Sequence, residues 1–496
     1  PQVSGDAASL YQTRCASGDL GDIIILDNAD MQDCVDVGLI ADISEDLPNY
    51  ENLMKYEEQI SLFNDSINEV IGKEGVYAIP AEMNSNGPTE YKEDTVAIMP
   101  RLRWDHYVEV GAPEMKNLDD LLDTLKKIQD AYPTNEAGDK TYALSLWPDW
   151  DNTSIENVNQ LTKWYGQEVN GSILLGTDNS ITPLTDKDGA YYKMLKFLYK
   201  ANQMGLVDPD SATQDWNAAC DKMRQGRVHL FWYNWQYGFW NSPDKGEARQ
   251  NYRGIPLEDL NIYQASDTYY GDGRAWAVGS NVSDEDKARI LEFMDWLCSP
   301  EGLTMQHIGQ EGFIYTVNDD GTYTLTDAGM TRFADDPQVP EELGGGSWTD
   351  GNNQVNQWLV ASIEMNPETG ETFGSDYWAS FLEKNNTATN KEWSEKFGSE
   401  TEVSYLEENG MLNPVPSVNL VLPIDTTDIA LIRSQCGDQV KATSWQAIFA
   451  SDDAEFDQMW DEMCVTLEGL GWDQLVEFDT DKYQAVVDAR EAATAE

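Results

Sequence analysis

Short apolar runs alternate with amphipathic stretches along the first part of the chain. Residues 22–28 place a run of isoleucine and leucine between aspartates, a pattern typical of a strand buried on both faces of a parallel sheet. Helices are expected on either side, over residues 9–17 and 31–37. Strands alternating with helices predict a doubly wound α/β fold, in which ligands bind beyond the carboxyl ends of strands. Asn28 lies at such an end.

Two more strands are expected at residues 75–80 and 95–99, with a polar loop between them that carries Glu82 and Asn84. This loop is also a candidate for ligand contact, and an ordinary turn is the alternative. Later stretches repeat apolar residues at helical spacing, and Asn117 precedes the first of them as an N-cap with acids in the first turn. These helices are expected over residues 117–128, 191–204, 283–297 and 456–467.

The segment 231–240 reads Phe-Trp-Tyr-Asn-Trp-Gln-Tyr-Gly-Phe-Trp, which is not the composition of an ordinary core strand. Indole and phenol rings offer flat apolar faces with a polar edge, and amide side chains offer paired donors and acceptors. Sugars have apolar C–H faces and hydroxyl groups, so this mixture suits a carbohydrate. A buried aromatic cluster is the alternative, and it fits Phe231 and Phe239 best. The candidates for ligand contact are Trp232, Asn234, Trp235 and Trp240.

A second aromatic signal, Trp-Pro-Asp-Trp-Asp at residues 147–151, follows an apolar strand expected at 142–146. It places two indoles beside two carboxylates. An indole face can stack on a pyranose, and a carboxylate can accept hydrogen bonds from neighbouring hydroxyls. The candidates here are Trp147, Trp150 and Asp151.

Composition narrows the class of protein. A chain of 496 residues is long for one core and indicates two or more domains, and its 41% hydrophobic content is enough for it to fold. The net charge of −57 argues against nucleic acid and anionic membrane surfaces as partners. No apolar run approaches the length of a transmembrane helix.

Cysteine and histidine spacing gives no sign of a metal or a cofactor. The six cysteines form no C-x-x-C pair, so buried free thiols are expected, with Cys15–Cys34 and Cys436–Cys464 as alternative bridges. The three histidines are not spaced as metal ligands, which weakens metallohydrolase and Ser-His-Asp interpretations. Residues 318–321 read Asn-Asp-Asp-Gly but lack the remaining carboxylates of a calcium loop, so a β-turn is expected.

Five motifs occur in order between residues 15 and 320, and together they resemble one family. They are Ala16-Ser17-Gly18-Asp19-Leu20 leading into 22–28 and 37–43, then Gly75–Pro80, Arg103-Trp104-Asp105 with Val110-Gly111-Ala112-Pro113, Leu198-Tyr199 with Gly205-Leu206-Val207-Asp208-Pro209, and Ser299-Pro300-Glu301-Gly302 with Gly309-Gln310-Glu311-Gly312. In this order they resemble extracellular solute-binding proteins, the lipoprotein-type carbohydrate-binding subunits of bacterial ABC importers.

The resemblance implies a two-lobed, type II periplasmic-binding-protein-like fold with hinged lobes and a central ligand cleft. Lobe one would hold residues 1–98 and 275–312, and lobe two would hold residues 99–274 and 313–496. Whether the C-terminal helices pack on lobe two or on lobe one stays open. In the family a strand and a helix, and a lipidated cysteine before them, precede the segment where this chain begins. Lobe one is therefore expected to lack its first strand and helix, and the membrane is expected as a partner only through that missing anchor.

The resemblance also implies a function without catalysis. The protein would bind an oligosaccharide in an aromatic-lined cleft and deliver it to ABC permease subunits, as a monomer that is an extracellular anchored lipoprotein or periplasmic. Arg274 could donate to sugar oxygens, and an interlobe salt bridge is its alternative. The cleft candidates are Asn28, Glu82, Asn84, Trp147, Trp150, Asp151, Trp232, Asn234, Trp235, Trp240, Arg274, Trp276 and Trp348.

Three other functions stay open. A peptide-binding transport receptor could also use a tryptophan-lined cleft. A glycoside hydrolase would need two carboxylates across the scissile bond, and with 89 acids a pair such as Asp149 and Asp151 is bound to occur by chance. A carbohydrate-binding adhesin would lack a permease partner.

Overall fold

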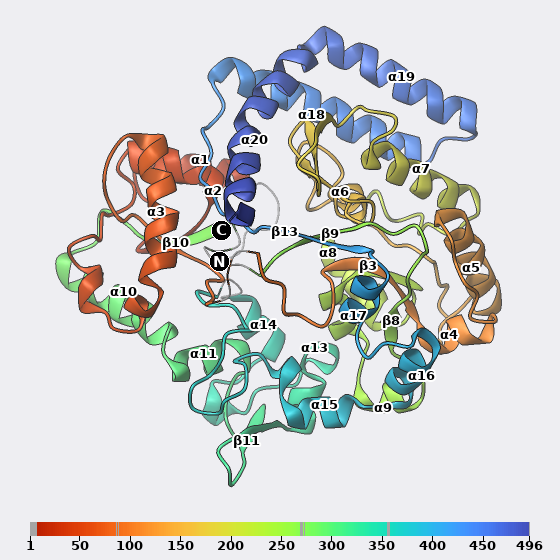
Figure 1. The fold of residues 1–496 in the computed structure, drawn as a ribbon, viewed down its shortest axis with the longest axis horizontal. Helices are drawn as coiled ribbons and strands as arrows, with labels where there is room; N and C mark the ends of the chain where they lie inside the picture. The colour runs from red at the N-terminus through yellow and green to blue at the C-terminus, as the bar shows by residue number, and fades with distance from the viewer. Residues whose placement is uncertain are drawn as a thin grey trace.

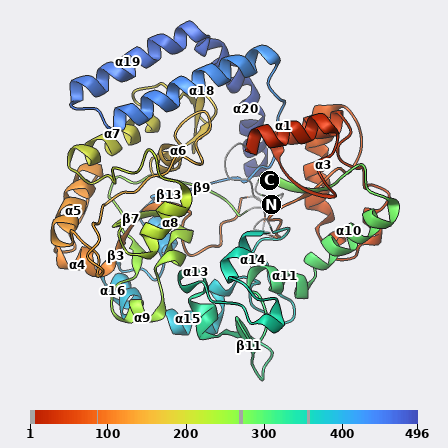
Figure 2. The ribbon, with the colours of Figure 1, turned by 180° about the vertical axis from the view of Figure 1, so that it is seen from behind.

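The computed structural model describes residues 7–85, 87, 89–267, 271, 273–354 and 358–495. Its helices and strands gather into a small N-terminal body, a large body and a third group of short elements between residues 308 and 385. Figures 1 and 2 show the small body on one side of the molecule and the large body on the other.

The small body contains a three-stranded antiparallel sheet in the order β1-β10-β2. Helices pack on both faces and form two core clusters. Its elements are α1 (Ala7–Ser17), β1 (Ile23–Asp27), α2 (Asn28–Asp36), η1 (Leu47–Asn49), η2 (Leu53–Tyr56), α3 (Glu57–Ile71), β2 (Ile79–Pro80), β10 (Arg274–Val278), α10 (Asp284–Leu297) and α11 (Pro300–His307).

The first strand differs from its prediction. We predicted a parallel strand buried on both faces, but β1 pairs antiparallel with β10 and its burial alternates. Ile24 and Leu26 join the core beneath α2 and α3, whereas Ile23 and Ile25 remain 39% and 40% exposed. A continuous apolar run cannot reveal that only one face of its strand will be covered, so this prediction was wrong.

The large body surrounds one extended core and contains three sheets, in the orders β7-β3-β8, β4-β5-β6 and β13-β9. Its strands are β3 (Ile98–Arg103), β4 (Gln167–Asn170), β5 (Ile173–Gly176), β6 (Ile181–Pro183), β7 (Leu230–Tyr233), β8 (Tyr252–Gly254), β9 (Ile262–Ala265) and β13 (Leu412–Val415). Its helices are α4 (Trp104–Glu109), α5 (Leu118–Ala131), α6 (Glu156–Thr162), α7 (Ala190–Gln203), α8 (Trp216–Arg224), η3 (Asn234–Phe239), α9 (Pro243–Glu247), α16 (Ala388–Phe397), α17 (Glu402–Glu408), α18 (Thr427–Ile448), α19 (Asp453–Leu470) and α20 (Trp472–Ala495).

The third group encloses a small core of its own, to which Ile314, Trp348 and Trp378 contribute. Residues 318–321 form the turn of the β11-β12 hairpin, as predicted, with the Gly321 amide donating to the Asn318 carbonyl. The elements are β11 (Tyr315–Val317), β12 (Tyr323–Leu325), α12 (Asp327–Met330), α13 (Arg332–Asp335), η4 (Glu341–Leu343), α14 (Trp348–Gln354), η5 (Ser375–Tyr377) and α15 (Ala379–Asn385).

The C-terminal part of the chain contacts both bodies. The amide of Val421 donates to the Ser66 hydroxyl, and that of Ile424 donates to the Gln32 side chain, both at 3.1 Å. Helices α18 and α19 pack beside α7 on the large body, and α20 lies between the two bodies in both views (Figures 1 and 2). The lobe boundaries given above stay a prediction.

The predicted N-cap at Asn117 is confirmed, and the helix expected over residues 283–297 begins with a similar cap. The Asn117 side chain accepts from the amides of Asp119 and Asp120, and the Ser283 hydroxyl accepts from the amide of Asp286, so both residues are N-caps. All six cysteines are free thiols; four of them are buried as expected, whereas Cys15 and Cys464 are only half-buried. Among the described residues, none of the helices combines the length and the apolar character needed to cross a bilayer.

Candidate ligand-binding site

Seven aromatic side chains from three separate segments meet at one place in the large body. We call this group the aromatic cluster. The loop after residue 146 contributes two of them, the first turn of α8 one, and β7 with η3 the remainder. The members are Trp147, Trp150, Trp216, Trp232, Tyr233, Trp235 and Phe239.

The cluster has a buried base and an exposed top. At the base, Trp147 and Trp232 are at most 1% exposed and stack nearly parallel, with their ring centroids 5.5 Å apart. Trp216 is half-buried above them. At the top, Trp150 and Trp235 are 38% and 42% exposed, a large fraction for indoles that touch so many other rings. The exposed rings are therefore supported from below by packed ones.

The exposed rings are close enough to act together. The ring centroid of Trp216 lies 4.5 Å from that of Trp150 and 5.4 Å from that of Trp235, and the last two are 6.1 Å apart. Tyr233 stacks against Trp235 at 4.6 Å. The planes of these three indoles are inclined to one another by 41°, 58° and 78°, so together they form a faceted aromatic surface, which we call the platform.

Trp216 was not among the residues predicted to contact a ligand. It stands alone in its stretch of sequence, after Asp215, whose side chain caps α8 by accepting from the amide of Ala218. The capping pattern marks the start of a helix, but no local pattern shows that this helix end lies beside residues 150 and 235.

Residues 231–233 form a core strand, so the interpretation of their composition was wrong for these positions. They belong to β7, which is buried at all four positions. Phe231 stacks on Tyr252 at 4.0 Å, and Trp232 lies against Trp147. Both faces of β7 are covered, so aromatic residues fill the core on each side.

Trp240 also lies inward, outside the cluster. Its indole N–H donates to the Gln250 carbonyl at 2.9 Å, and the cations of Arg103 and Lys245 lie over its ring. Those partners occupy both its edge and its face. Asn234, at the start of η3, accepts from the amide of Trp235 through its side-chain oxygen.

Two carboxylates fix the loop of residues 147–151, one of them to α8 and the other to α18. Asp149 accepts from the backbone amide of Trp216 at 2.8 Å. Asp151 accepts from the Glu156 amide at 2.9 Å and from the indole N–H of Trp445, on α18, at 2.7 Å. Burial raises the pKa of Asp151 to about 6, and these two hydrogen bonds oppose the rise. Asp151 therefore connects the exposed Trp150 to a helix from the C-terminal part of the chain.

A buried ion pair holds the segment that carries Trp235. Arg101 donates to the carbonyl of Trp232 at 2.6 Å and pairs with Glu402, on α17, at 3.3 Å. Glu402 also accepts from the Tyr237 hydroxyl of η3 at 2.5 Å and from the Gly254 amide at 2.9 Å. Burial alone would raise the pKa of Glu402, but the nearby arginines and these donors keep it below its usual value. The aromatic segment is thus held at both of its ends.

The remaining candidates lie in the small body and the third group. Asn28 donates to Asn419. Glu82 adopts a positive φ of 61°, and its amide donates to the Trp358 carbonyl at 2.8 Å. Asn84 is buried, and its carbonyl accepts from the Gln59 side chain at 3.0 Å.

Arg274 pairs with Asp27 at 3.3 Å across neighbouring strands of one sheet, so this ion pair does not join the two bodies. Trp276 is buried in the small-body core, and Trp348 packs edge-on against Phe333 in the third group.

The structure therefore divides the predicted set of residues. It brings Trp147, Trp150, Asp151, Trp232, Asn234 and Trp235 together, and it places the other candidates elsewhere.

Within the described part of the chain, no group of three or more His, Cys, Asp or Glu side chains is arranged to hold a metal ion. In Figure 1 helix α8 lies on the side of the large body toward α13, and η3 contacts α13 directly.

The family of the chain is established by a sequence comparison. A model of the family described as bacterial extracellular solute-binding protein matches residues 2–304, more than half of the chain. The protein belongs to this family. No curated protein sequence matches it significantly.

Solved structures show the same fold at low sequence identity. The S. pneumoniae ABC-transporter substrate-binding protein FusA, in complex with kestose, matches with a TM-score of 0.59 at 18% identity, over 97% of this chain and 92% of that one. A human-milk-oligosaccharide (HMO)-binding solute-binding protein from Bifidobacterium longum infantis matches with a TM-score of 0.58 at 16% identity, over 97% and 91%. Alginate-binding protein AlgQ2 matches with a TM-score of 0.60 at 15% identity, over 96% and 89%.

Proposed function

We propose that this protein binds an oligosaccharide on the aromatic cluster and delivers it to the permease of a bacterial ABC importer. The observation that carries the proposal is the group of three adjoining indoles, Trp150, Trp216 and Trp235, held half-exposed on a packed base. Exposed indoles favour burial against an apolar surface, and the C–H face of a sugar provides one while its hydroxyls stay hydrated.

The extent of the platform favours more than one sugar unit. Three rings whose centroids are 4.5–6.1 Å apart provide a surface wider than a single ring. The excess of acidic over basic residues in the chain disfavours acidic sugars. Solute-binding proteins of the same fold whose ligands are kestose and human milk oligosaccharides support this cargo class.

In this proposal the protein carries its ligand and does not cleave it. Asp149 and Asp151, in the loop that carries Trp150, accept hydrogen bonds from Trp216 and Trp445 and hold the site in place. A glycoside hydrolase would need a pair of carboxylates directed at a scissile bond. In its family role the protein would act outside the cytoplasmic membrane, periplasmic or anchored to the cell surface, as a monomer.

A thermal-shift screen of the purified chain tests this proposal. Neutral plant, milk and mucin oligosaccharides are compared with short peptides of similar size. A ligand that binds only the folded state raises the melting temperature, so a shift is expected with one oligosaccharide series, which chromatography should recover uncleaved. A shift with peptides alone, or cleavage of the sugar, would overturn the assignment.

Two variants test the site once a ligand is known. Trp150→Ala and Trp235→Ala should each weaken binding by roughly tenfold or more, since each removes a stacking face that is half-exposed in the free protein. The melting temperature of the free protein should change little. Phe293→Ala, which removes a similarly exposed ring from α10 of the small body, is the matched control and should bind normally. Equal losses in all three variants would argue against the platform.

A further inference from the structure

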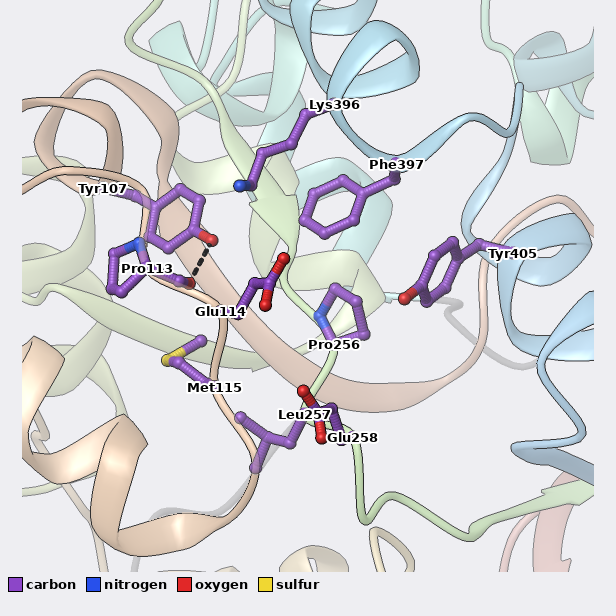
Figure 3. A pocket seen from close by; sticks show the side chains of 10 residues that line it. All are labelled: Tyr107, Pro113, Glu114, Met115, Pro256, Leu257, Glu258, Lys396, Phe397 and Tyr405. Carbon is purple, nitrogen blue, oxygen red and sulfur yellow. Dashed lines mark hydrogen bonds between the residues drawn. The ribbon is translucent and has the colours of Figure 1, made fainter.

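A cavity lies on the large body and shares no residue with the aromatic cluster. It has a volume of about 280 Å³ and lies where the end of α4, the loop before α5, the loop after β8, and helices α16 and α17 converge. Figure 3 shows its side chains directed toward a common space. Segments far apart in the sequence build this pocket, so no local sequence pattern indicates it.

The floor and walls of the pocket are apolar and aromatic. Tyr107, Met115 and Leu257 form a floor that is at most 2% exposed. Phe397 and Tyr405 form a half-buried wall, with ring centroids 5.4 Å apart in an edge-to-face arrangement. Trp393 packs behind Phe397 at 5.0 Å, so the wall is supported from within the core.

Two carboxylates, both exposed to solvent, line this aromatic space. Glu114 lies near the centre of the pocket, between the rings of Tyr107 and Phe397, and Glu258 lies at its lower edge (Figure 3). Neither carboxylate has an ion-pair partner within 4.0 Å among the residues that the structure describes. Burial first, and then the charges of Glu258 and Glu114, raise the pKa of Tyr405, so both negative charges act on the same wall.

The pocket contains one cation, and that cation is already engaged. The ammonium group of Lys396 donates to the Ala112 carbonyl at 2.9 Å, and it lies over the rings of Tyr107 and Phe397 at 5.6 and 5.5 Å. Two carboxylates against one ammonium leave the lining with a net negative charge. The position of Lys396 shows that these ring faces accept a positive charge.

We propose that this pocket binds a small organic cation of the alkylammonium class beside Lys396, held by the ring of Tyr405 and the carboxylates of Glu114 and Glu258. Aromatic faces attract a cation through their quadrupole, and the carboxylates add charge-assisted hydrogen bonds. An anion would be repelled by both carboxylates. A neutral guest would gain nothing from their charge.

Calorimetric titration of the full chain tests the proposal, with putrescine as the probe and 1,4-butanediol as its uncharged counterpart. Putrescine should occupy one site with an affinity that falls as salt rises, and butanediol should not bind. The double variant Glu114→Gln/Glu258→Gln should weaken putrescine binding by roughly fivefold or more. Tyr405→Leu, which keeps an apolar side chain but removes the ring, should also weaken it.

The control separates a site from general attraction to an acidic protein. Glu285→Gln/Glu292→Gln removes the same charge from α10 of the small body, where both residues are exposed, and should leave binding unchanged. Equal losses in the two double variants would overturn the proposal, and so would butanediol binding as tightly as putrescine. Thermal melting of each variant confirms that it is folded, so a loss of binding can be assigned to the pocket.

Discussion

At the scale of the residue, what covers a tryptophan decides its role in this protein. Trp232 and Trp235 lie three positions apart in one aromatic segment, yet the first is fully buried and the second is 42% exposed. The difference arises because β7 ends at Tyr233 and η3 turns the chain outward. A stacking surface therefore lies directly beside a core strand that supports it.

The buried histidines make a prediction about pH. Burial lowers the pKa of His229 to about 4, and burial with the nearby Arg103 lowers that of His106 to about 2. The two imidazole rings lie 5.4 Å apart in the large body. Each pKa is below the unfolded value of 6.5, so the folded state binds fewer protons. The stability contributed by the neutral rings is present above pH 6.5 and is lost as the pH falls below it.

His229→Leu should therefore reduce the acid sensitivity of the fold. Between pH 7 and pH 5, the loss in free energy of unfolding should be smaller in the variant than in the parent by about 2 kcal/mol. Urea denaturation at the two pH values measures it. An equal loss in both proteins would show that His229 takes up no extra proton on unfolding.

At the scale of the element, η3 depends on contacts made by α17. The hydroxyl of Tyr237 and the guanidinium of Arg101 both reach Glu402, which is fully buried at the start of that helix. Residue 402 lies far beyond the part of the chain matched by the family model, which ends at residue 304. The C-terminal part of the chain thus positions a site whose rings come from the middle of the sequence.

Tyr237→Phe should lower the free energy of unfolding by about 1–3 kcal/mol, because it leaves the buried Glu402 with one hydrogen bond fewer. It should also weaken oligosaccharide binding several-fold, because η3 carries Trp235. Chemical denaturation and ligand titration measure the two effects. Tyr192→Phe is the matched control, because the Tyr192 hydroxyl, on α7, donates to Asp457 of α19 at 2.9 Å. That variant should keep its affinity, and a loss as large as that of Tyr237→Phe would argue against a positioning role.

At the scale of the whole molecule, the two bodies have separate cores. The core of the large body and those of the small body contain different residues, and the chain passes between them more than once. Hinge closure around a ligand is a common transition of periplasmic-type binding proteins. The platform on the large body would then be covered by the small body or by the third group.

Saturating oligosaccharide should therefore decrease the radius of gyration measured by small-angle X-ray scattering. The double variant Trp150→Ala/Trp235→Ala should show no decrease at the same ligand concentration. An unchanged radius in the parent protein, with binding confirmed by titration, would mean that the bodies do not close.

The sequence by itself determined the main helices and the family, but not every strand, since residues 142–146 form isolated bridges instead of the expected strand. Helix caps at Asn117 and Ser283 depend on neighbours a few residues away, so their signals are present in the chain. The ordered motifs predicted the solute-binding family and its fold. The two aromatic segments that supply most of the cluster were also evident, because their composition is unusual.

Only the tertiary structure decided which of these residues meet and which are covered. Trp216 belongs to the platform because helix α8 begins beside the loop of residues 147–151. Trp240 lies outside it, where its ring contacts the cations of Arg103 and Lys245 and its indole N–H donates to the carbonyl of Gln250. Burial depends on elements that pack from distant parts of the chain. The exposed side of β1, the contact of Glu402 with η3 and the pocket beside α16 and α17 are all consequences of such packing, and none leaves a local pattern in the sequence.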